Sequence, residues 1–89
     1  MQTETVHGSR IRCYDNGGKT YDRFTVVFMD SPEREPGIFT AVGMSEEPFH
    51  PLGFGQHTAA MPGKHLGRRV PFVSLPEPCQ KLVRADLAA

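Results

Sequence analysis

A glycine-rich turn between two strand-forming runs constrains this chain more than any other feature. The stretch 10–29 reads RIRCYDNGGKTYDRFTVVFM. Asn16, Gly17 and Gly18 tolerate the positive φ angles that tight hairpin turns require. The runs on both sides are rich in β-branched and aromatic residues, which favour strands. The sequence therefore predicts a β-hairpin as the unit on which the rest of the chain is built.

Side-chain alternation assigns faces to the two predicted strands. In the second strand, Phe24, Val26 and Phe28 share one face, whereas Thr25 and Val27 lie on the other. Because both faces of this strand carry apolar residues, we expect it to be central in its sheet. The first strand has charges on one face, so we expect it nearer an edge.

Further segments complete the predicted fold. A third strand is expected over 38–43 and a short fourth strand over 68–73. Ser74 and Glu77 form a capping-box pattern, which predicts a helix after them. Residues 44–67 have no clean period and contain repeated Pro and Gly, so we expect a long ordered loop with one short helical turn over 56–61. The expected fold class is α+β, with an antiparallel meander of three to four strands, one C-terminal helix and this loop.

Length and composition bound the class of protein. With 89 residues, we expect a flexible N-terminal tail over 1–9, or at most a short edge strand around Val6, and a single α+β domain over 10–89. Ten basic and ten acidic residues give a formal net charge of zero, which argues against a nucleic-acid partner without excluding one. No apolar run approaches the length of a membrane span, and the N-terminus lacks the pattern of a secretory signal. We therefore expect a cytoplasmic protein that does not bind a membrane.

The cysteines and histidines form no recognisable chemical motif. Cys13 and Cys79 fall on the inferred inward faces of a strand and of the helix, so we expect both to be reduced core residues. Three of the four histidines lie in the loop, at separations of seven and eight residues that match no zinc-binding pattern. We expect neither a metal nor a cofactor. The loop histidines are His50, His57 and His65.

Two polar clusters are the candidates for a binding site. The hairpin turn concentrates carboxylates, amides and basic groups, which either stabilise the turn or face a ligand. A basic cluster within six positions could join Lys19 and Arg23 in an anion site, although the zero net charge favours a solvated basic turn. The cluster consists of Lys64, His65, Arg68 and Arg69. The candidate ligand- or partner-binding residues are Asp15, Asn16, Lys19, Asp22, Arg23, His50, Gln56, His57, His65 and Arg68.

Three stretches of the chain resemble a group of short bacterial proteins, some of them associated with phages or plasmids. The stretches are CYDNGGKTYDRFTVVF, PFHPLGFGQH and LPEPCQKLVRADL, so the resemblance runs from about Arg12 onward. It implies no activity, because no biochemical function is assigned to the group. The resemblance implies that nine residues belong to the pattern that defines the group: Asp15, Asn16, Gly17, Asp22, Arg23, Gly53, Gly55, Gln56 and His57.

The sequence leaves two classes of function open. We favour a small non-enzymatic binding or accessory protein that acts through the hairpin turn and the 44–67 loop. One helix cannot shield both faces of a four-stranded sheet, so the second face is covered by the loop, by a protein partner or by a second copy in a homodimer. The alternative is a small enzyme, which requires His57 within hydrogen-bond reach of Asp15 or Asp22.

Overall fold

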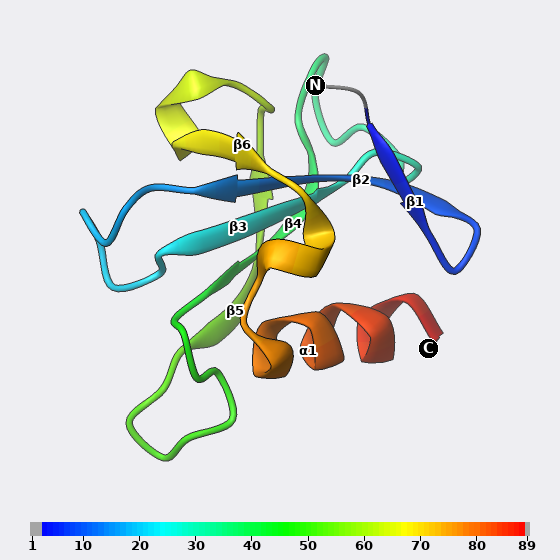
Figure 1. The fold of residues 1–89 in the computed structure, drawn as a ribbon. Coiled ribbons are helices and arrows are strands. Elements are labelled where there is room, and N and C mark those ends of the chain that lie inside the picture. Colours follow the sequence, from blue (N-terminus) through cyan, green and yellow to red (C-terminus); the bar gives the residue numbers. More distant parts are fainter. Residues whose placement is uncertain (1–2, 89) are drawn as a thin grey trace.

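One antiparallel sheet and one α-helix make up the computed structural model, which describes residues 3–88 and has the predicted α+β fold class. The strands are β1 (Glu4–Val6), β2 (Ser9–Asp15), β3 (Phe24–Phe28), β4 (Phe39–Met44), β5 (Gly55–Ala60) and β6 (Arg68–Val70). Two 3₁₀ turns, η1 (Lys64–Leu66) and η2 (Phe72–Ser74), flank β6, and helix α1 (Glu77–Ala88) follows. Figure 1 shows α1 lying across one face of the sheet.

Strand β2 has neighbours along both of its edges. The strand order is β1-β2-β3-β4-β5, and β6 pairs with β2 beside β1. One edge of β2 pairs with β3, while the other edge is shared by β1 along 9–11 and by β6 along 13–15. The hairpin is confirmed, and β3 is central in the strand order, while β2 lies one place nearer the edge that β1 and β6 form. The charges of Arg10 and Arg12 mark a solvent-facing surface of β2, not a free edge.

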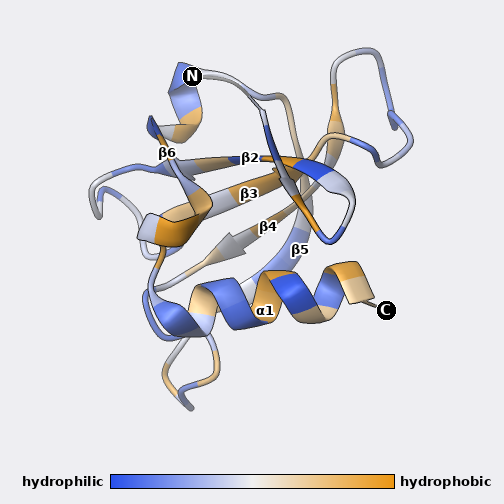
Figure 2. Cartoon of the chain, turned by 45° about the vertical axis from the view of Figure 1, so that its right-hand side comes forward, coloured by the Kyte–Doolittle hydropathy of each residue, from blue (hydrophilic) through white to orange (hydrophobic). Residues whose placement is uncertain are grey.

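The face under α1 carries the main hydrophobic core, and the predicted alternation of the hairpin holds there. Figure 2 shows apolar positions along β2, β3 and β4 and alternating apolar and polar positions along α1. Gln80, which the helical pattern places facing out, is 8% exposed, and its Nε2 donates to the Leu75 carbonyl at 2.8 Å. The core residues are Ile11, Cys13, Phe24, Val26, Phe28, Val42, Met44, Val70, Phe72, Leu75, Cys79 and Val83.

The second face carries a smaller apolar cluster, formed by Tyr14, Val27 and Ala41, all buried. Leu66 of η1 packs against this cluster, so the segment between β5 and β6 covers it. The Arg69 guanidinium lies over the Tyr14 ring at 5.6 Å from its centroid. The sequence leaves three covers open for this face, which are the loop, a protein partner and a second copy. In the structure, the loop of the same chain packs on the cluster.

The segment 44–67 is more regular than the sequence predicts. Residues 55–60 form β5, which pairs with β4 from Phe39↔Ala60 to Met44↔Gly55. The expected helical turn over 56–61 is therefore wrong. A six-residue helix is marginal in isolation, whereas the free edge of β4 offers a full ladder of hydrogen bonds.

The N-terminal segment also joins the sheet. Glu4–Val6 forms β1, which is the short edge strand around Val6 that the sequence offers as the alternative to a flexible tail; residues 1–2 lie outside the described residues. His7 and Gly8, both at positive φ, make the tight turn into β2. The Glu4 carboxylate accepts the Phe72 backbone N–H at 2.8 Å, so β1 is anchored to η2. With β1 and β5 added, the sheet has six strands, not three to four.

Helix α1 begins later than the capping-box pattern predicts. Ser74 belongs to η2, and its hydroxyl donates to the Pro71 carbonyl at 2.7 Å instead of capping α1. The carbonyl of Pro76 accepts the first helical N–H groups, those of Cys79 and Gln80. The prediction that Ser74 caps the helix is wrong, because Pro76 favours extended backbone at Leu75, which separates Ser74 from the helix.

Candidate functional site

The turn between β2 and β3 is organised by its own side chains. Asn16 Oδ1 accepts the backbone N–H groups of Gly18 and Lys19 at 2.9 and 3.0 Å. Asn16 Nδ2 donates to Thr20 Oγ1 at 2.7 Å, and this hydroxyl donates to Asp22 Oδ1 at 2.7 Å. A turn held in this way loses little conformational entropy when a ligand contacts it.

Arg23 connects the hairpin turn to the end of β4. Its Nε and Nη2 donate to the two carboxylate oxygens of Asp15 at 2.8 and 3.1 Å, and its Nη1 donates to Glu46 at 2.5 Å. The hydrogen bond from Arg23, together with the Gly17 N–H and the nearby Arg68, lowers the pKa of Asp15 below its ordinary value. Asp15 is therefore a carboxylate at neutral pH, and Arg23 holds it in place.

An open cleft of about 650 Å³, here called the neutral cleft, lies between the hairpin turn and the loop 45–53. Its charged lining consists of Lys19 and Arg23 on the turn, and of Glu46 and Glu47 on the loop. These charges balance when the histidine of the cleft is neutral. The cleft therefore has no preference for an ion of either sign.

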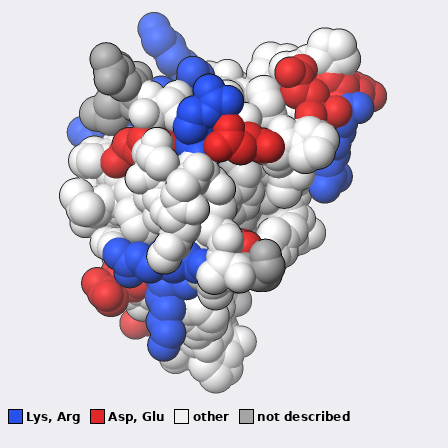
Figure 3. All heavy atoms as spheres, turned by 90° about the vertical axis from the view of Figure 1, so that its right-hand side faces the viewer, with Lys and Arg blue, Asp and Glu red and all other residues white. Residues whose placement is uncertain are grey.

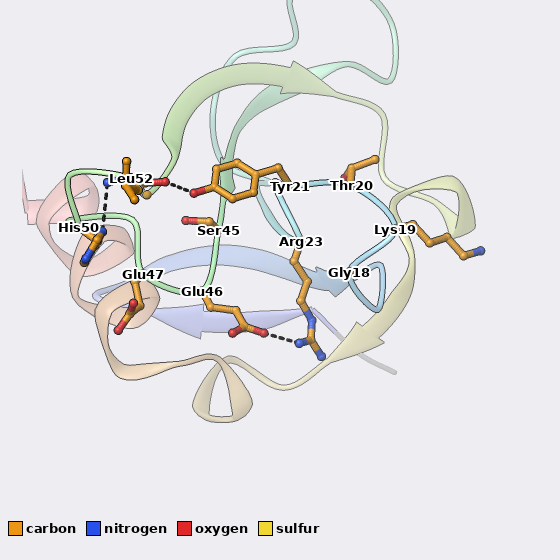
Figure 4. A pocket seen from close by; sticks show the side chains of 11 residues that line it. Gly18, Lys19, Thr20, Tyr21, Arg23, Ser45, Glu46, Glu47, His50 and Leu52 are labelled. Carbon is orange, nitrogen blue, oxygen red and sulfur yellow. Dashed lines mark hydrogen bonds and ion pairs between the residues drawn. The ribbon is translucent and has the colours of Figure 1, made fainter.

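Side chains from both walls meet across the neutral cleft (Figure 4). The Tyr21 hydroxyl donates to the Leu52 carbonyl, and the Tyr21 ring meets the Phe54 ring edge-on at 6.2 Å. His50 Nδ1 accepts the Leu52 N–H at 3.0 Å within the loop. Yet the side chains of Tyr21, Phe49 and Leu52 are 63%, 59% and 79% exposed. Phe49 and Leu52 therefore belong to an apolar surface of the loop and are not part of the core.

A second cavity of about 490 Å³, here called the basic hollow, lies between the same turn and the segment 64–68. Its charged lining consists of four cations and one carboxylate, a formal excess of three positive charges: Lys19, Arg23, Lys64, Arg68 and Asp15. Gly67 allows the close approach of the two walls, because a Cβ there would lie 2.4 Å from the Asp15 carbonyl oxygen. The structure thus brings Lys64 and Arg68 of the expected basic cluster to Lys19 and Arg23, whereas His65 and Arg69 do not line this hollow.

The candidate residues from the sequence separate into two sets. One set lines at least one of the two cavities: Asp15, Asn16, Lys19, Arg23, His50 and Arg68. Of the others, Asp22 bonds within the turn, Gln56 is exposed on β5, and His65 is exposed on η1.

His57 lies outside both cavities. Its Nε2 is 2.8 Å from Asp86 Oδ2 of α1, and neither Asp15 nor Asp22 is its partner. The arrangement that the enzyme alternative requires is therefore not formed. Within residues 3–88, no group of three or more His, Cys, Asp or Glu side chains is placed to hold a metal ion.

The two thiols are buried in the core and unbridged. Burial raises the pKa of Cys13 to about 12 and that of Cys79 to about 11. The Cys79 thiol also donates to the Ser45 carbonyl at 3.1 Å. Both groups are therefore protonated at neutral pH, which makes them poor nucleophiles.

The sequence-based candidates do not include the acidic and apolar wall of the neutral cleft. Glu46, Glu47 and Leu52 line it, but they carry no motif. The position of Glu46 beside Arg23 can be inferred from the register of β3 and β4. Because Phe24 pairs with Met44, the residues just outside this pair, Arg23 and the segment after β4, must lie close together.

Comparisons with protein-family models, with curated proteins and with solved structures each return no match. In the part of the chain that the structure describes, no helix has the length and apolar character needed to cross a membrane.

Proposed function

We propose that the protein is a small non-enzymatic binding protein whose neutral cleft holds a peptide segment of a protein partner. The observation that carries this proposal is the pair of exposed side chains, Leu52 and Tyr21, at a cleft whose charges balance. Polypeptide segments combine apolar side chains with polar and oppositely charged groups, which matches this lining. Exposed aromatic and aliphatic residues around a concave surface are typical of protein-binding sites.

The walls of the neutral cleft are well ordered for this role. The base of the loop is closed by a backbone hydrogen bond in which Ser45 N donates to Phe54 O at 2.8 Å. The Ser45 hydroxyl also accepts the Phe54 N–H at 2.9 Å. Together with the internally bonded hairpin turn, this arrangement lowers the entropy lost when a peptide orders the two loops.

The enzyme alternative receives no comparable support. It needs a general base beside a polar cleft, but His57 pairs with Asp86 away from both cavities. A cytoplasmic location is part of the proposal and is supported by the two buried, unbridged thiols. Membership of the bacterial group that the hairpin sequence resembles is likewise proposed.

Selection from a phage-displayed library of random linear peptides tests the proposal. An enriched peptide is titrated into ¹⁵N-labelled protein, and we expect amide shifts confined to 18–23 and 45–54. Leu52→Ser removes the most exposed apolar side chain of the cleft and should weaken this peptide by about tenfold or more, as truncation of an interface anchor does.

Val73→Ser is the matched control, because Val73 is 76% exposed but lies outside the neutral cleft. The peptide should bind this variant as tightly as the wild type. A library that enriches no peptide, or peptides equally weakened by both substitutions, would contradict a role for the cleft in peptide binding.

A further inference from the structure

We infer that the basic hollow is a second binding site, which takes a compact polyanion such as inorganic pyrophosphate or the phosphate chain of a nucleotide. It lies on the opposite side of the hairpin turn from the neutral cleft, and its lining has a different charge. The inference does not depend on peptide binding at the cleft.

Three cations in the hollow are available to a ligand. Asp15 is the one carboxylate in the lining, and Arg23 already engages both of its oxygens. Among residues 3–88, no ion pair engages the side chains of Lys19, Lys64 or Arg68. These three like charges repel one another, and an anion among them removes that repulsion while accepting charge-assisted hydrogen bonds.

The backbone holds the two basic segments in fixed positions. Arg68 pairs with Asp15 in the β2–β6 ladder, and the Gly67 N–H donates to the Lys64 carbonyl at 3.0 Å. On the opposite wall, the Lys19 backbone is fixed by Asn16. Figure 4 shows the Lys19 side chain extending away from the neutral cleft, on the side where the chain leads into β6. The main chain therefore holds the segments that carry these cations on the two facing walls of the hollow.

We expect side chains, and not backbone N–H groups, to bind the anion. The Gly17, Gly18 and Lys19 N–H groups are all used within the turn, so they are not donors for an anion. The available donors are two ammonium groups and one guanidinium. Ammonium groups bind phosphate as point charges, whereas a guanidinium can contact two phosphate oxygens at once.

The size and surroundings of the hollow favour a small ligand over a nucleic acid. A volume of about 490 Å³ lies within the range of small-molecule sites. The chain as a whole has zero formal charge. Figure 3 shows the side of the molecule away from the hairpin turn, where Lys and Arg groups lie next to Asp and Glu groups and form no continuous basic track. A nucleic-acid backbone needs such a track, since its affinity comes from many phosphate contacts.

The test is a titration of ¹⁵N-labelled protein with inorganic pyrophosphate at low ionic strength. We expect saturable amide shifts at 15–19 and 64–68. Lys64→Glu should weaken binding by about tenfold or more, because it removes one charge-assisted contact and adds repulsion. Lys81→Glu makes the same charge change on the exposed side of α1 and should leave the affinity within about twofold, because the site is screened from it.

Additional measurements identify the chemical source of the anion and control for a variant that fails to fold. Tighter binding of ADP than of pyrophosphate would assign the site to a nucleotide, and equal binding would assign it to the phosphate chain alone; both support the inference. Lys19→Gln, from the opposite wall, should also weaken pyrophosphate, so the test does not rest on one variant. Leu52→Ser should leave the affinity for pyrophosphate unchanged, which distinguishes this site from the neutral cleft.

Three results would overturn the inference. The first is the absence of saturable shifts with pyrophosphate. The second is equal weakening by Lys64→Glu and Lys81→Glu, which would indicate an effect of net charge only. The third is tighter binding of a thymidine oligonucleotide than of pyrophosphate at the same amides, which would assign the surface to single-stranded nucleic acid.

Discussion

The neutral cleft and the basic hollow share one wall and differ in the other. Lys19 and Arg23 of the hairpin turn line both cavities. Opposite them, the loop 45–53 contributes carboxylates and an exposed leucine, whereas the segment 64–68 contributes further cations. The shared turn provides a rigid centre, and the facing segment decides which chemistry each cavity can recognise.

The two facing walls are also attached in different ways. The loop 45–53 is joined to the hairpin turn by side chains, through the Arg23–Glu46 ion pair and the Tyr21–Leu52 hydrogen bond. The segment 64–68 is joined by backbone, through the β6 ladder and the close approach at Gly67. We therefore expect backbone changes to affect the basic hollow most strongly, and side-chain changes to affect the neutral cleft.

Gly67→Ala should have the largest effect. Gly67 has a φ of 113°, and an added Cβ would lie 2.4 Å from the Asp15 carbonyl oxygen. Strain and steric overlap together should lower the free energy of unfolding by about 2–4 kcal/mol, measured by urea denaturation. Gly18→Ala is the control, because its φ is 88° but its surroundings are open, and it should cost about 1 kcal/mol. Equal costs for the two variants would contradict the close approach.

Gly53→Ala should have a smaller effect, confined to the other cavity. A Cβ there would lie 1.9 Å from the Glu47 carbonyl oxygen, so the loop must shift. Because the loop is exposed, we expect a cost of about 1–2 kcal/mol, with amide shifts limited to 45–54. Comparable shifts at 64–68 would show that the two walls are coupled, and would contradict their separate attachment.

Asp15→Asn should cost about 1 kcal/mol at neutral pH, as expected for an ion pair near the surface. The pKa of Asp15 is lowered from 3.8 in the folded protein, mainly by Arg23. The carboxylate therefore stabilises the fold above its unfolded pKa, and this contribution is lost as the pH falls through the folded value. Urea denaturation should give different stabilities near neutral pH and converging ones in acid. A difference that is constant with pH would contradict the pairing with Arg23.

Arg23→Lys should have the smallest effect on stability, but it should weaken ligand binding at both cavities. A lysine keeps the charge that faces Asp15 and Glu46 but cannot engage both as a planar guanidinium does. We expect a modest loss of affinity for both the selected peptide and pyrophosphate. A loss limited to one ligand would mean that Arg23 organises only one of the two cavities.

The local features of the fold were predictable, and the distant pairings were not. The hairpin, its faces and the apolar side of α1 follow from neighbouring residues, and all three are present. Strand β5 has the sequence GQHTAA, which lacks a strong strand signal, so it depends on the edge that β4 provides. The same holds for β1, whose turn at His7–Gly8 carries only a weak signal.

The candidate site shows the same division between local and distant information. Asp15, Asn16, Lys19 and Arg23 were predictable because the turn sequence places them together. Glu46 meets Arg23 only through the β3–β4 register, which no local pattern gives. The sequence leaves open whether the loop histidines converge, and the structure separates two of them, because β5 carries His57 to Asp86 whereas His50 lines the neutral cleft.

A double titration of one ¹⁵N-labelled sample tests most directly whether the hairpin turn separates two independent cavities. Pyrophosphate is added first, and the peptide selected on the neutral cleft is added to the saturated sample. We expect pyrophosphate to shift the amides of 64–68 but not those of 45–53, and the peptide to do the reverse with its affinity unchanged. Competition between the two ligands, or one common set of shifted amides, would contradict the account.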